Sequence, residues 1–277
     1  MISILILTKN EEQDLPDCLK SVAWCDDVHV LDSISNDKTI EIAKNFHAHT
    51  YLRRFDNYAS QRNFALDNFN FKYDWIFILD ADESFSESLE NSLKNLLINI
   101  PSNFDGIRLR RKDFLNNKWL KHAQMTPFYT RILRKGKGRY HREINEVLEI
   151  QGDIFDFEGY FNHYPFSKGF SHWLNKHNLY STMEAERWIQ ENNGNFEFSL
   201  KKALFSKDFT EKRYHQKGLY YKLPFRPLIK WIYLVILKRS FLDGKEGIIV
   251  ATLQSIYEYF IEIKTKELMI QNSAKDK

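Results

Sequence analysis

Short apolar runs alternate with helical segments in the first hundred residues, and this pattern constrains the fold more than any other feature of the 277-residue chain. The apolar runs predict four strands, at residues 2–7, 28–32, 49–52 and 75–80. Segments of helical periodicity follow these strands, at residues 10–22, 39–46, 58–69 and 86–98, the last with Ser86 as N-cap. The alternation predicts an α/β fold, a mostly parallel sheet flanked by helices.

The pattern changes after residue 100. Further short strands are expected at residues 106–110, 130–133 and 147–150, and they would extend the sheet in mixed orientation; residues 155–161 also resemble a strand. Long helices are expected at residues 169–189 and 251–269. We therefore predict an α/β domain over residues 1–166 and a helical C-terminal region over residues 167–277.

Composition excludes several classes of protein. Only 10 glycines are present, and neither G-x-G-x-x-G nor a P-loop occurs, which argues against dinucleotide-binding and P-loop enzymes. Cys18 and Cys25 are too few for a disulfide framework or a zinc site, so a reducing, cytoplasmic setting is expected. The N-terminal apolar run lacks a basic region before it, and the longest later run, 228–237, is interrupted by Lys230. Neither a signal peptide nor a membrane span is predicted.

The net charge of +3 hides an uneven distribution. Residues 104–142 carry 12 Lys/Arg and 2 acids, residues 201–245 carry 12 and 3, and the remainder carries −16. Two basic blocks indicate a polyanionic partner, although a solvated lysine-rich surface explains either block alone. No nucleic-acid reader motif accompanies them. The second block is mixed with aromatic residues, which favours a peripheral contact with an anionic membrane; packing of Trp231, Leu234, Val235 and Leu237 into a helical core is the alternative.

Acidic and hydroxyl side chains follow three of the predicted parallel strands. Asp80 and Asp82 end the fourth strand, Asp32 ends the second and Thr8 ends the first. Ligands of open α/β sheets bind at this edge, and two aspartates spaced along an extended segment suit a hard cation with phosphate oxygens. Capping of the following helices is the alternative for each residue.

These residues resemble a known family. Thr8-Lys9-Asn10-Glu11-Glu12, Asp32-Ser33-Ile34-Ser35-Asn36-Asp37, Gln61-Arg62-Asn63 and Leu79-Asp80-Ala81-Asp82-Glu83 are similar to the family 2 inverting glycosyltransferases of GT-A fold. The resemblance implies that the nucleotide is bound by Thr8, Glu11, Asp32, Arg62 and Asp80. It also implies that Asp80 and Asp82 hold Mg²⁺ or Mn²⁺ on the diphosphate.

The second half resembles the bacterial lipopolysaccharide-core beta-1,4-glucosyltransferase group. The similarity lies in residues 139–148, in Asn162-His163-Tyr164, in 176–180, in Glu184-Ala185 and in 241–247. That group usually has Val-His-Glu where this chain has Ile144-Asn145-Glu146, so the glutamate is kept and the histidine is not. The resemblance implies transfer of glucose from UDP-glucose to the heptose of the lipopolysaccharide inner core, at the inner face of the bacterial inner membrane.

Inversion by single displacement needs a base for the acceptor hydroxyl, and Glu146 is the candidate, with Glu143 as competitor. Surface pairing with Arg139 or Arg142 is the alternative for both glutamates. His163 is a candidate contact for the metal or diphosphate, or a structural histidine. Arg131 and Arg142 are candidate phosphate contacts. Lys176 and Tyr180 line one helix face, either as an acceptor wall or as part of a salt-bridged stripe with Glu184.

Two other functions use the same features. A sugar nucleotidyltransferase also needs paired aspartates at a strand end, but it forms a nucleotide diphosphate sugar instead of releasing UDP. A non-catalytic saccharide-binding protein would keep the fold and the aromatic surface without a requirement for Glu146.

Overall fold

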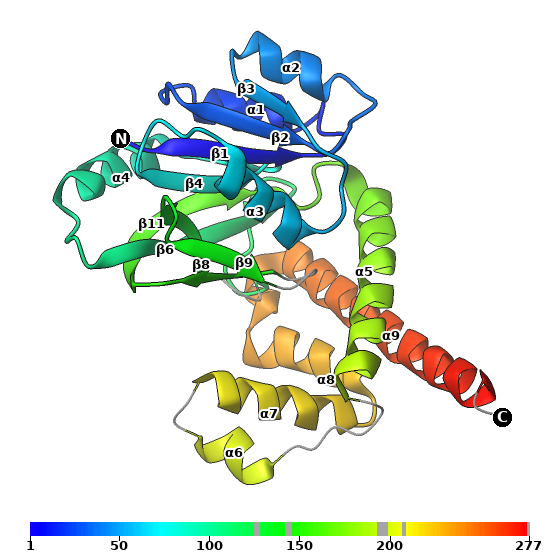
Figure 1. Cartoon of the computed structure of the whole chain (residues 1–277). Coiled ribbons are helices and arrows are strands. Elements are labelled where there is room, and N and C mark those ends of the chain that lie inside the picture. The colour runs from blue at the N-terminus through cyan, green and yellow to red at the C-terminus, as the bar shows by residue number, and fades with distance from the viewer. Residues whose placement is uncertain (125–127, 142–145, 193–198, 207–208, 276–277) are drawn as a thin grey trace. The chain divides into compact units, whose positions relative to one another are not determined.

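The computed structural model of the chain describes residues 1–124, 128–141, 146–192, 199–206 and 209–275 (Figure 1). It divides into two compact units. The first contains Met1–Trp119 and Gln124–Gly169, and the second contains Leu120–Ala123 and Phe170–Lys277. Each unit has its own secondary structure and is described separately.

A large mixed sheet forms the centre of the first unit. Among the described residues its order is β3-β2-β1-β4-β8-β6-β11-β5, with β7 paired to β6. The strands are β1 (Ser3–Thr8), β2 (Val28–Asp32), β3 (His49–Leu52), β4 (Trp75–Asp80), β5 (Glu83–Ser84), β6 (Phe104–Leu115), β7 (Lys118–Trp119), β8 (Phe128–Arg134) and β11 (Asp153–His163). The pairs among β3, β2, β1 and β4 are parallel, whereas β8 lies antiparallel between β4 and β6. The predicted α/β fold is confirmed.

Strand order places a ligand-binding edge in this sheet. The chain passes from β1 to β2 and β3 on one side and returns to β4 on the other side of β1. Such a change of direction leaves a crevice beyond the carboxyl ends of the strands. The register puts Thr8 opposite Asp32 and Leu7 opposite Asp80. The three strand ends singled out in the sequence therefore lie side by side.

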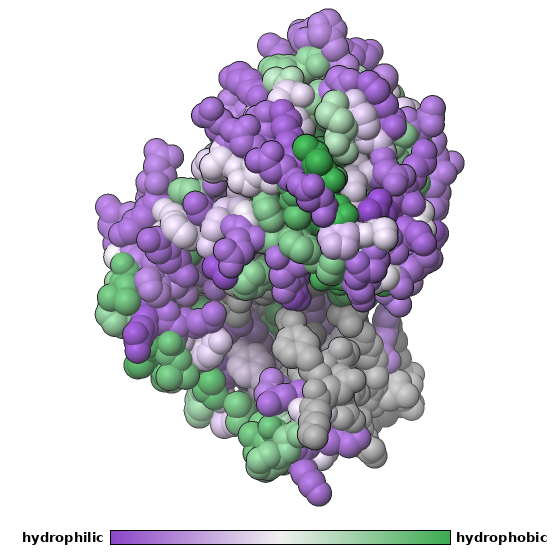
Figure 2. All heavy atoms as spheres, turned by 90° about the vertical axis from the view of Figure 1, so that its left-hand side faces the viewer, coloured by the Kyte–Doolittle hydropathy of each residue, from purple (hydrophilic) through white to green (hydrophobic). Residues whose placement is uncertain are grey.

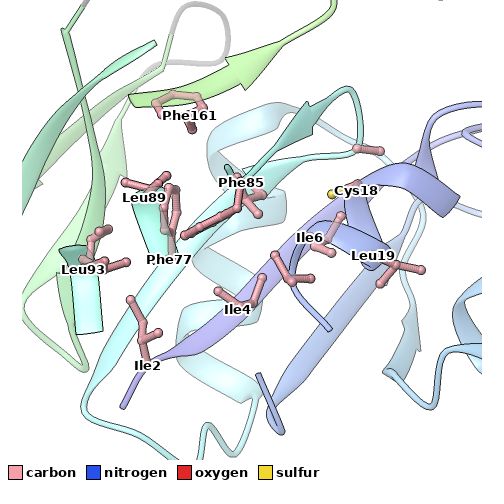
Figure 3. Packing of buried hydrophobic residues seen from close by; sticks show 14 of the residues in the cluster. Ile2, Ile4, Ile6, Cys18, Leu19, Phe77, Phe85, Leu89, Leu93 and Phe161 are labelled. Carbon is pink, nitrogen blue, oxygen red and sulfur yellow. The ribbon is translucent and has the colours of Figure 1, made fainter. Parts of the chain in front are cut away.

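Apolar side chains on both faces of the parallel strands explain why helices must cover them. Ile4 and Ile6 of β1 join Phe77 of β4 in one cluster, while Leu5 points to a second cluster on the opposite face. Figure 3 shows the first cluster, with Leu89 close to Phe77. The helices of this unit are α1 (Leu15–Ser21), α2 (Thr39–Asn45), α3 (Tyr58–Asn68) and α4 (Glu87–Asn99).

Helix starts agree with the sequence in one case and differ in another. The Ser86 hydroxyl accepts a hydrogen bond from the Leu89 amide at 3.2 Å, so the predicted N-cap of α4 is confirmed. The helix expected from residue 10 begins only at Leu15. Pro16 stands in the first turn of α1, where the missing amide costs no helical hydrogen bond.

One predicted strand lies in a different sheet from the one expected. β10 (Val147–Ile150) has the predicted bounds, but it pairs antiparallel with β9 (Gly138–His141) in a separate two-stranded sheet. The expectation that it extends the main sheet is wrong. β10 forms its backbone hydrogen bonds with β9 instead. The strand β9 was not predicted, because its basic sequence has no apolar alternation.

The second unit is helical. It contains most of α5 (Gly169–Asn192), followed by α6 (Leu200–Phe205), α7 (Phe209–Lys222), α8 (Arg226–Ile232), the π-helical turn η1 (Tyr233–Leu237), the 3-10 turn η2 (Ser240–Asp243) and α9 (Gly244–Lys275). Leu234 and Val235 pack against Ala251 of α9. In the described part of the chain, no helix is both long and apolar enough to cross a membrane.

Candidate active site at the carboxyl ends of the sheet

The ends of β1 and β2 are joined by a buried hydrogen-bond network. The Thr8 hydroxyl donates to Asp32 at 2.7 Å, and Asp32 also accepts from the amide and the hydroxyl of Ser35 at 2.7 and 2.6 Å. The Lys9 ammonium donates to the carbonyl of Ser33 at 2.7 Å. Asp32 is fully buried, and these donors compensate the loss of water around its carboxylate. The turn after β2 is thus held rigid beside the end of β1.

Arginines and carboxylates form a second network at the end of β4. Arg62 of α3 donates to Asp80 at 2.7 Å and, through its other terminal nitrogen, to Glu146. Arg131 of β8 donates to Asp80 at 3.2 Å and to the buried Glu83 at 2.8 Å. Asp80 thereby connects both arginines.

Burial opposes the charge on these two guanidinium groups. The carboxylates around them outweigh it: Asp80 and Glu146 raise the pKa of Arg62, and Glu83 and Asp80 raise the pKa of Arg131. Both arginines therefore stay charged, whereas burial raises the pKa of Glu83 to about 7. Two buried cations at the carboxyl end of a sheet can bind an anionic group such as a diphosphate.

Glu146 owes its place to the residue after Arg62. The Asn63 amide donates to the Tyr140 carbonyl at 2.8 Å and its side-chain oxygen accepts from the Tyr140 amide at 2.8 Å. These bonds tie β9 to α3, and Glu146 directly precedes β10, the partner of β9. The Arg-Asn pair recognised in the sequence thus brings the proposed base to the end of β4.

The carboxylate of Asp82 lies next to the imidazole of His163. The chain turns at Ala81 and Asp82 before β5, so the extended spacing that would put Asp80 and Asp82 on one side is interrupted. His163 of β11 lies with Nε2 3.5 Å from Asp82 and Nδ1 2.7 Å from Asp113. Burial and Arg111 oppose a charged imidazole, but Asp82 and Asp113 outweigh them and raise the pKa of His163 to about 9.

Asp82 and His163 have the chemistry of a divalent metal site. Asp113 holds Nδ1 of His163, as a carboxylate commonly does behind a metal-binding histidine, and leaves Nε2 directed at Asp82. Among the described residues no group of three or more His, Cys, Asp or Glu side chains is arranged to hold a metal ion. A carboxylate and an imidazole, together with phosphate oxygens of a ligand, would suit Mn²⁺ or Mg²⁺, and His163, which its raised pKa keeps protonated at neutral pH, would release its proton on binding the cation.

Glu11 lies beside this edge and forms an ion pair with a lysine. Its carboxylate accepts from the Lys168 ammonium at 2.6 Å, and its second oxygen is buried without a hydrogen-bond partner. Burial raises the pKa of Glu11 to about 7, although Lys168 opposes the shift. An unpaired buried acceptor is costly, which suits a ligand that donates a hydrogen bond to it.

The structure brings together most, but not all, of the predicted residues. Thr8, Asp32, Arg62, Asp80 and Glu146 are linked as described, and Arg131 joins them. Lys176 and Tyr180 lie on α5, where the ammonium is 5.8 Å from the centre of the Tyr180 ring. Glu143 and Arg142 fall outside the described residues.

Three functional candidates were not singled out from the sequence. Glu83, Asp113 and Lys168 each contact a residue of the predicted site. Glu83 directly follows the Asp-x-Asp pair, and this adjacency was the available signal. Asp113 and Lys168 are brought in by strand pairing and by a loop, which no local pattern shows.

The family follows from comparison with known sequences. The model of the family described as Glycosyl transferase family 2 matches residues 3–157, which is more than half of the chain. The chain belongs to this family. The prediction of a family 2 glycosyltransferase with its α/β fold is therefore confirmed.

Relatives of this glycosyltransferase extend beyond the matched region. The lipopolysaccharide core biosynthesis glycosyltransferase LpsC of Rhizobium meliloti is 24% identical over 272 residues, which cover 95% of this chain and 91% of LpsC. Among solved structures, S. aureus TarS 1-349 in complex with UDP-GlcNAc is 13% identical, with a TM-score of 0.45, over 93% of this chain and 91% of TarS 1-349. The resemblance to lipopolysaccharide-core enzymes is thus supported by a relative of nearly equal extent.

Proposed function

We propose that this glycosyltransferase transfers a hexose from a UDP-sugar, UDP-glucose in the first place, to a saccharide acceptor with inversion. The observation that carries the proposal is the chain of contacts from Glu146 through Arg62 to Asp80. It links a carboxylate able to act as base to the sheet edge at which family 2 enzymes are expected to bind the nucleotide. The similarity to LpsC over most of both chains supports an acceptor in the lipopolysaccharide core, and we propose the heptose of the inner core.

Each residue then has a role in the reaction. Thr8, Glu11 and Asp32 bind the nucleoside, and Asp80 orients Arg62 and Arg131 toward the diphosphate. Asp82, Asp80 and His163 would hold Mg²⁺ or Mn²⁺, which would neutralise charge on the departing diphosphate. Glu146 accepts the proton of the acceptor hydroxyl as that oxygen attacks the anomeric carbon, and the bond to the diphosphate breaks. The attack occurs from the side opposite the leaving group, so the configuration inverts.

The two regions outside this edge have proposed partners as well. Phosphates of the acceptor would meet the basic residues of 104–142, Arg142 among them, and Lys176 and Tyr180 would line the acceptor side. The second basic block would lie on an anionic membrane at its cytoplasmic face.

Nucleotide release tests the proposal. Purified chain is incubated with a panel of sugar nucleotides and a heptose-containing acceptor, with Mn²⁺ or with EDTA, and UDP and the anomeric configuration of the product are measured. We expect acceptor-dependent release of UDP that EDTA abolishes. Formation of a nucleotide diphosphate sugar would indicate a nucleotidyltransferase, and saccharide binding without turnover would indicate a non-catalytic protein.

Two matched variants test the base. Glu146→Gln is expected to lower turnover at least roughly a hundredfold, because it removes the proton acceptor and keeps the shape of the side chain. Glu143→Gln serves as its control and is expected to keep transfer. The opposite result would assign the base to Glu143.

A further inference from the structure

Residues 223–242 of the second unit expose an unusual amount of apolar surface. Nine large side chains in these 20 residues are exposed, namely Leu223, Phe225, Leu228, Ile232, Tyr233, Ile236, Leu237, Phe241 and Leu242. Figure 2 shows hydrophobic side chains gathered along its lower left edge, whereas the upper part of that view is mostly hydrophilic. Exposed apolar residues occur singly on most surfaces, but a run of this size indicates a binding surface.

Five of the exposed residues lie on one helical stretch, α8 followed by η1 over residues 226–237, which also buries apolar side chains; the other four lie before it or in η2. Trp231, Leu234 and Val235 pack in one cluster with Ala251 of α9, as the core-packing alternative expects, whereas Leu237 is 70% exposed. Leu228, Ile232 and Ile236 recur every four residues and all face solvent. A surface helix normally has polar residues on its outer side. The outer side of this helix therefore has the composition of a buried surface.

Phe225 combines an unfavourable backbone conformation with an exposed side chain. It occupies the left-handed backbone region, with φ of 55°, which is unusual for a bulky residue. Its side chain is nevertheless 76% exposed, so packing within the unit does not compensate the strain. The Phe225 carbonyl accepts from the Ile229 amide at 3.1 Å at the start of α8, so the backbone is used within the chain while the ring is left available to an external contact.

Cations surround the apolar residues. Lys222, Arg239 and Lys245 are exposed, and Lys238 is half-buried. Within residues 222–245, all of which the structure describes, Asp243 is the one acidic residue, and its buried carboxylate accepts from the amides of His122 and Ala123 at 2.7 and 2.8 Å. The surface is thus apolar at its centre and positive at its margin.

We propose that residues 223–242 dock on an anionic phospholipid bilayer, with Phe225, Leu228, Ile232 and Ile236 entering the interface and the cations meeting lipid phosphates. Apolar side chains flanked by Lys and Arg are what an interfacial helix needs. A second copy of the chain fits less well, because a symmetric contact would bring the same cations face to face. The inference deepens the proposed function, since a lipopolysaccharide acceptor is held at a membrane, but its test needs no transfer.

Vesicle cosedimentation of the full chain tests the docking. The probes are phosphatidylcholine vesicles with and without phosphatidylglycerol, at low and high salt. We expect binding that requires phosphatidylglycerol and falls with salt. The triple variant Leu228→Ser, Ile232→Ser, Ile236→Ser should bind vesicles at least roughly tenfold more weakly than the wild type. The matched triple variant Leu52→Ser, Ile98→Ser, Ile270→Ser changes exposed positions outside the segment and should bind vesicles as the wild type does.

Two further variants separate docking from folding. Phe225→Gly relieves the left-handed strain, so it should preserve or raise the melting temperature and still weaken vesicle binding. Lys238→Gln with Arg239→Asn should reduce the preference for phosphatidylglycerol, asparagine being chosen because Arg239 also has a positive φ of 60°.

Several results would overturn the inference. Equal vesicle binding by the wild type and the first triple variant would do so, as would absence of binding to phosphatidylglycerol vesicles. Conversion of a wild-type dimer to a monomer by that triple variant, with no vesicle binding, would assign the surface to a second copy. Transfer to a soluble acceptor without vesicles is measured in parallel; if it is absent while vesicle binding is present, the proposed function fails and the docking stands.

Discussion

Arg62 is the residue on which the candidate site depends. It is 2% exposed, and its two terminal nitrogens contact carboxylates that come from different parts of the chain, Asp80 at the end of β4 and Glu146 before β10. A planar guanidinium can make both contacts at once, whereas a lysine ammonium is a single point charge. The geometry of the proposed base relative to the nucleotide edge is therefore fixed by one side chain.

Arg62→Lys should consequently abolish most transfer while the chain still folds. One of the two carboxylates loses its partner in a buried setting, so we expect the free energy of unfolding to fall by roughly 1–3 kcal/mol. Urea unfolding and UDP release measure the two effects. Arg53→Lys is the control, because Arg53 contacts Asp56 near the surface and its replacement should cost less than about 1 kcal/mol. Equal losses in both variants would contradict the role given to Arg62.

Glu11 predicts a pH dependence of stability whose sign follows from its raised pKa. Burial shifts the pKa from 4.5 to about 7, so the folded chain keeps a proton that the unfolded chain has lost between these values. Its contribution to stability is complete below about pH 4.5 and is lost as the pH rises toward 7, up to roughly 3 kcal/mol. Urea unfolding in EDTA without nucleotide should show this loss in the wild type and a smaller loss in Glu11→Gln. The exposed Glu41→Gln should leave the pH dependence unchanged, and a matching loss in both variants would contradict the assignment.

The sequence predicted the parts of the site that depend on local pattern. Thr8, Asp32 and Asp80 follow apolar strands, and parallel pairing brings their ends together. Arg62 could be assigned only through resemblance to the family, because its side chain reaches the site from a helix. Asp113 and Lys168 were missed because their contacts join segments about 50 and 150 residues apart in sequence, as in the bond from Lys168 to Asn10. Whether these residues perform the proposed roles stays a prediction.

At the scale of elements, boundaries were predictable where apolar runs end in turn residues. The predicted bounds of β2, β3, β4 and β10 coincide with the structure. β9 was missed because its sequence, Gly138-Arg139-Tyr140-His141, has no apolar alternation and becomes a strand through pairing with β10. A strand that depends on its partner in this way cannot be read from its own residues.

The segment 241–247 shows a structural reason for a sequence motif. Gly244 has a positive φ of 71°, and Asp243 binds the amides of His122 and Ala123, so this segment anchors a distant loop at the start of α9. At Gly247 an added Cβ would lie 1.9 Å from the backbone oxygen of Ser240, a distance no side chain can occupy. Gly244 and Gly247 are therefore required by the backbone conformation at the start of α9.

Gly247→Ala should destabilise the second unit although alanine is the better helix former. The clash with backbone requires η2 or α9 to shift, and we expect a loss of roughly 3 kcal/mol in the free energy of unfolding. Gly136→Ala is the control: its φ of 74° makes alanine strained, but nothing lies within 4 Å, so the cost should be only about 1 kcal/mol. Chemical denaturation followed by circular dichroism compares the two variants. A Gly247→Ala variant that is more stable than the wild type would contradict the close approach of Gly247 to the backbone of Ser240.

At the scale of the whole molecule, the small net charge of +3 is the sum of opposed regions. The acidic residues include the edge formed by Glu11, Asp80 and Asp82, whereas the basic blocks lie in residues 104–142 and 201–245. Several cations of the first block are used inside the fold, because Arg111 and Arg131 pair with Asp113 and Glu83. Cations of the second block lie beside the exposed apolar residues 223–242. Arg226 of the second block is likewise buried against Glu258 and Glu262, so each block contains both paired and exposed cations, which charge counts alone could not distinguish.

Ligand binding should raise the stability of the whole chain in a metal-dependent way. UDP with Mn²⁺ at about a hundred times its dissociation constant should contribute roughly 3 kcal/mol, because it binds only the folded state. For a chain of this size that corresponds to a rise in melting temperature of roughly 5–10 °C. Differential scanning fluorimetry with UDP and Mn²⁺, compared with UDP and EDTA, measures the metal-dependent part. Asp82→Asn should remove that part, whereas Asp74→Asn, at an exposed carboxylate that pairs with Arg134, should keep it. A full metal-dependent shift in Asp82→Asn would show that the cation is held elsewhere.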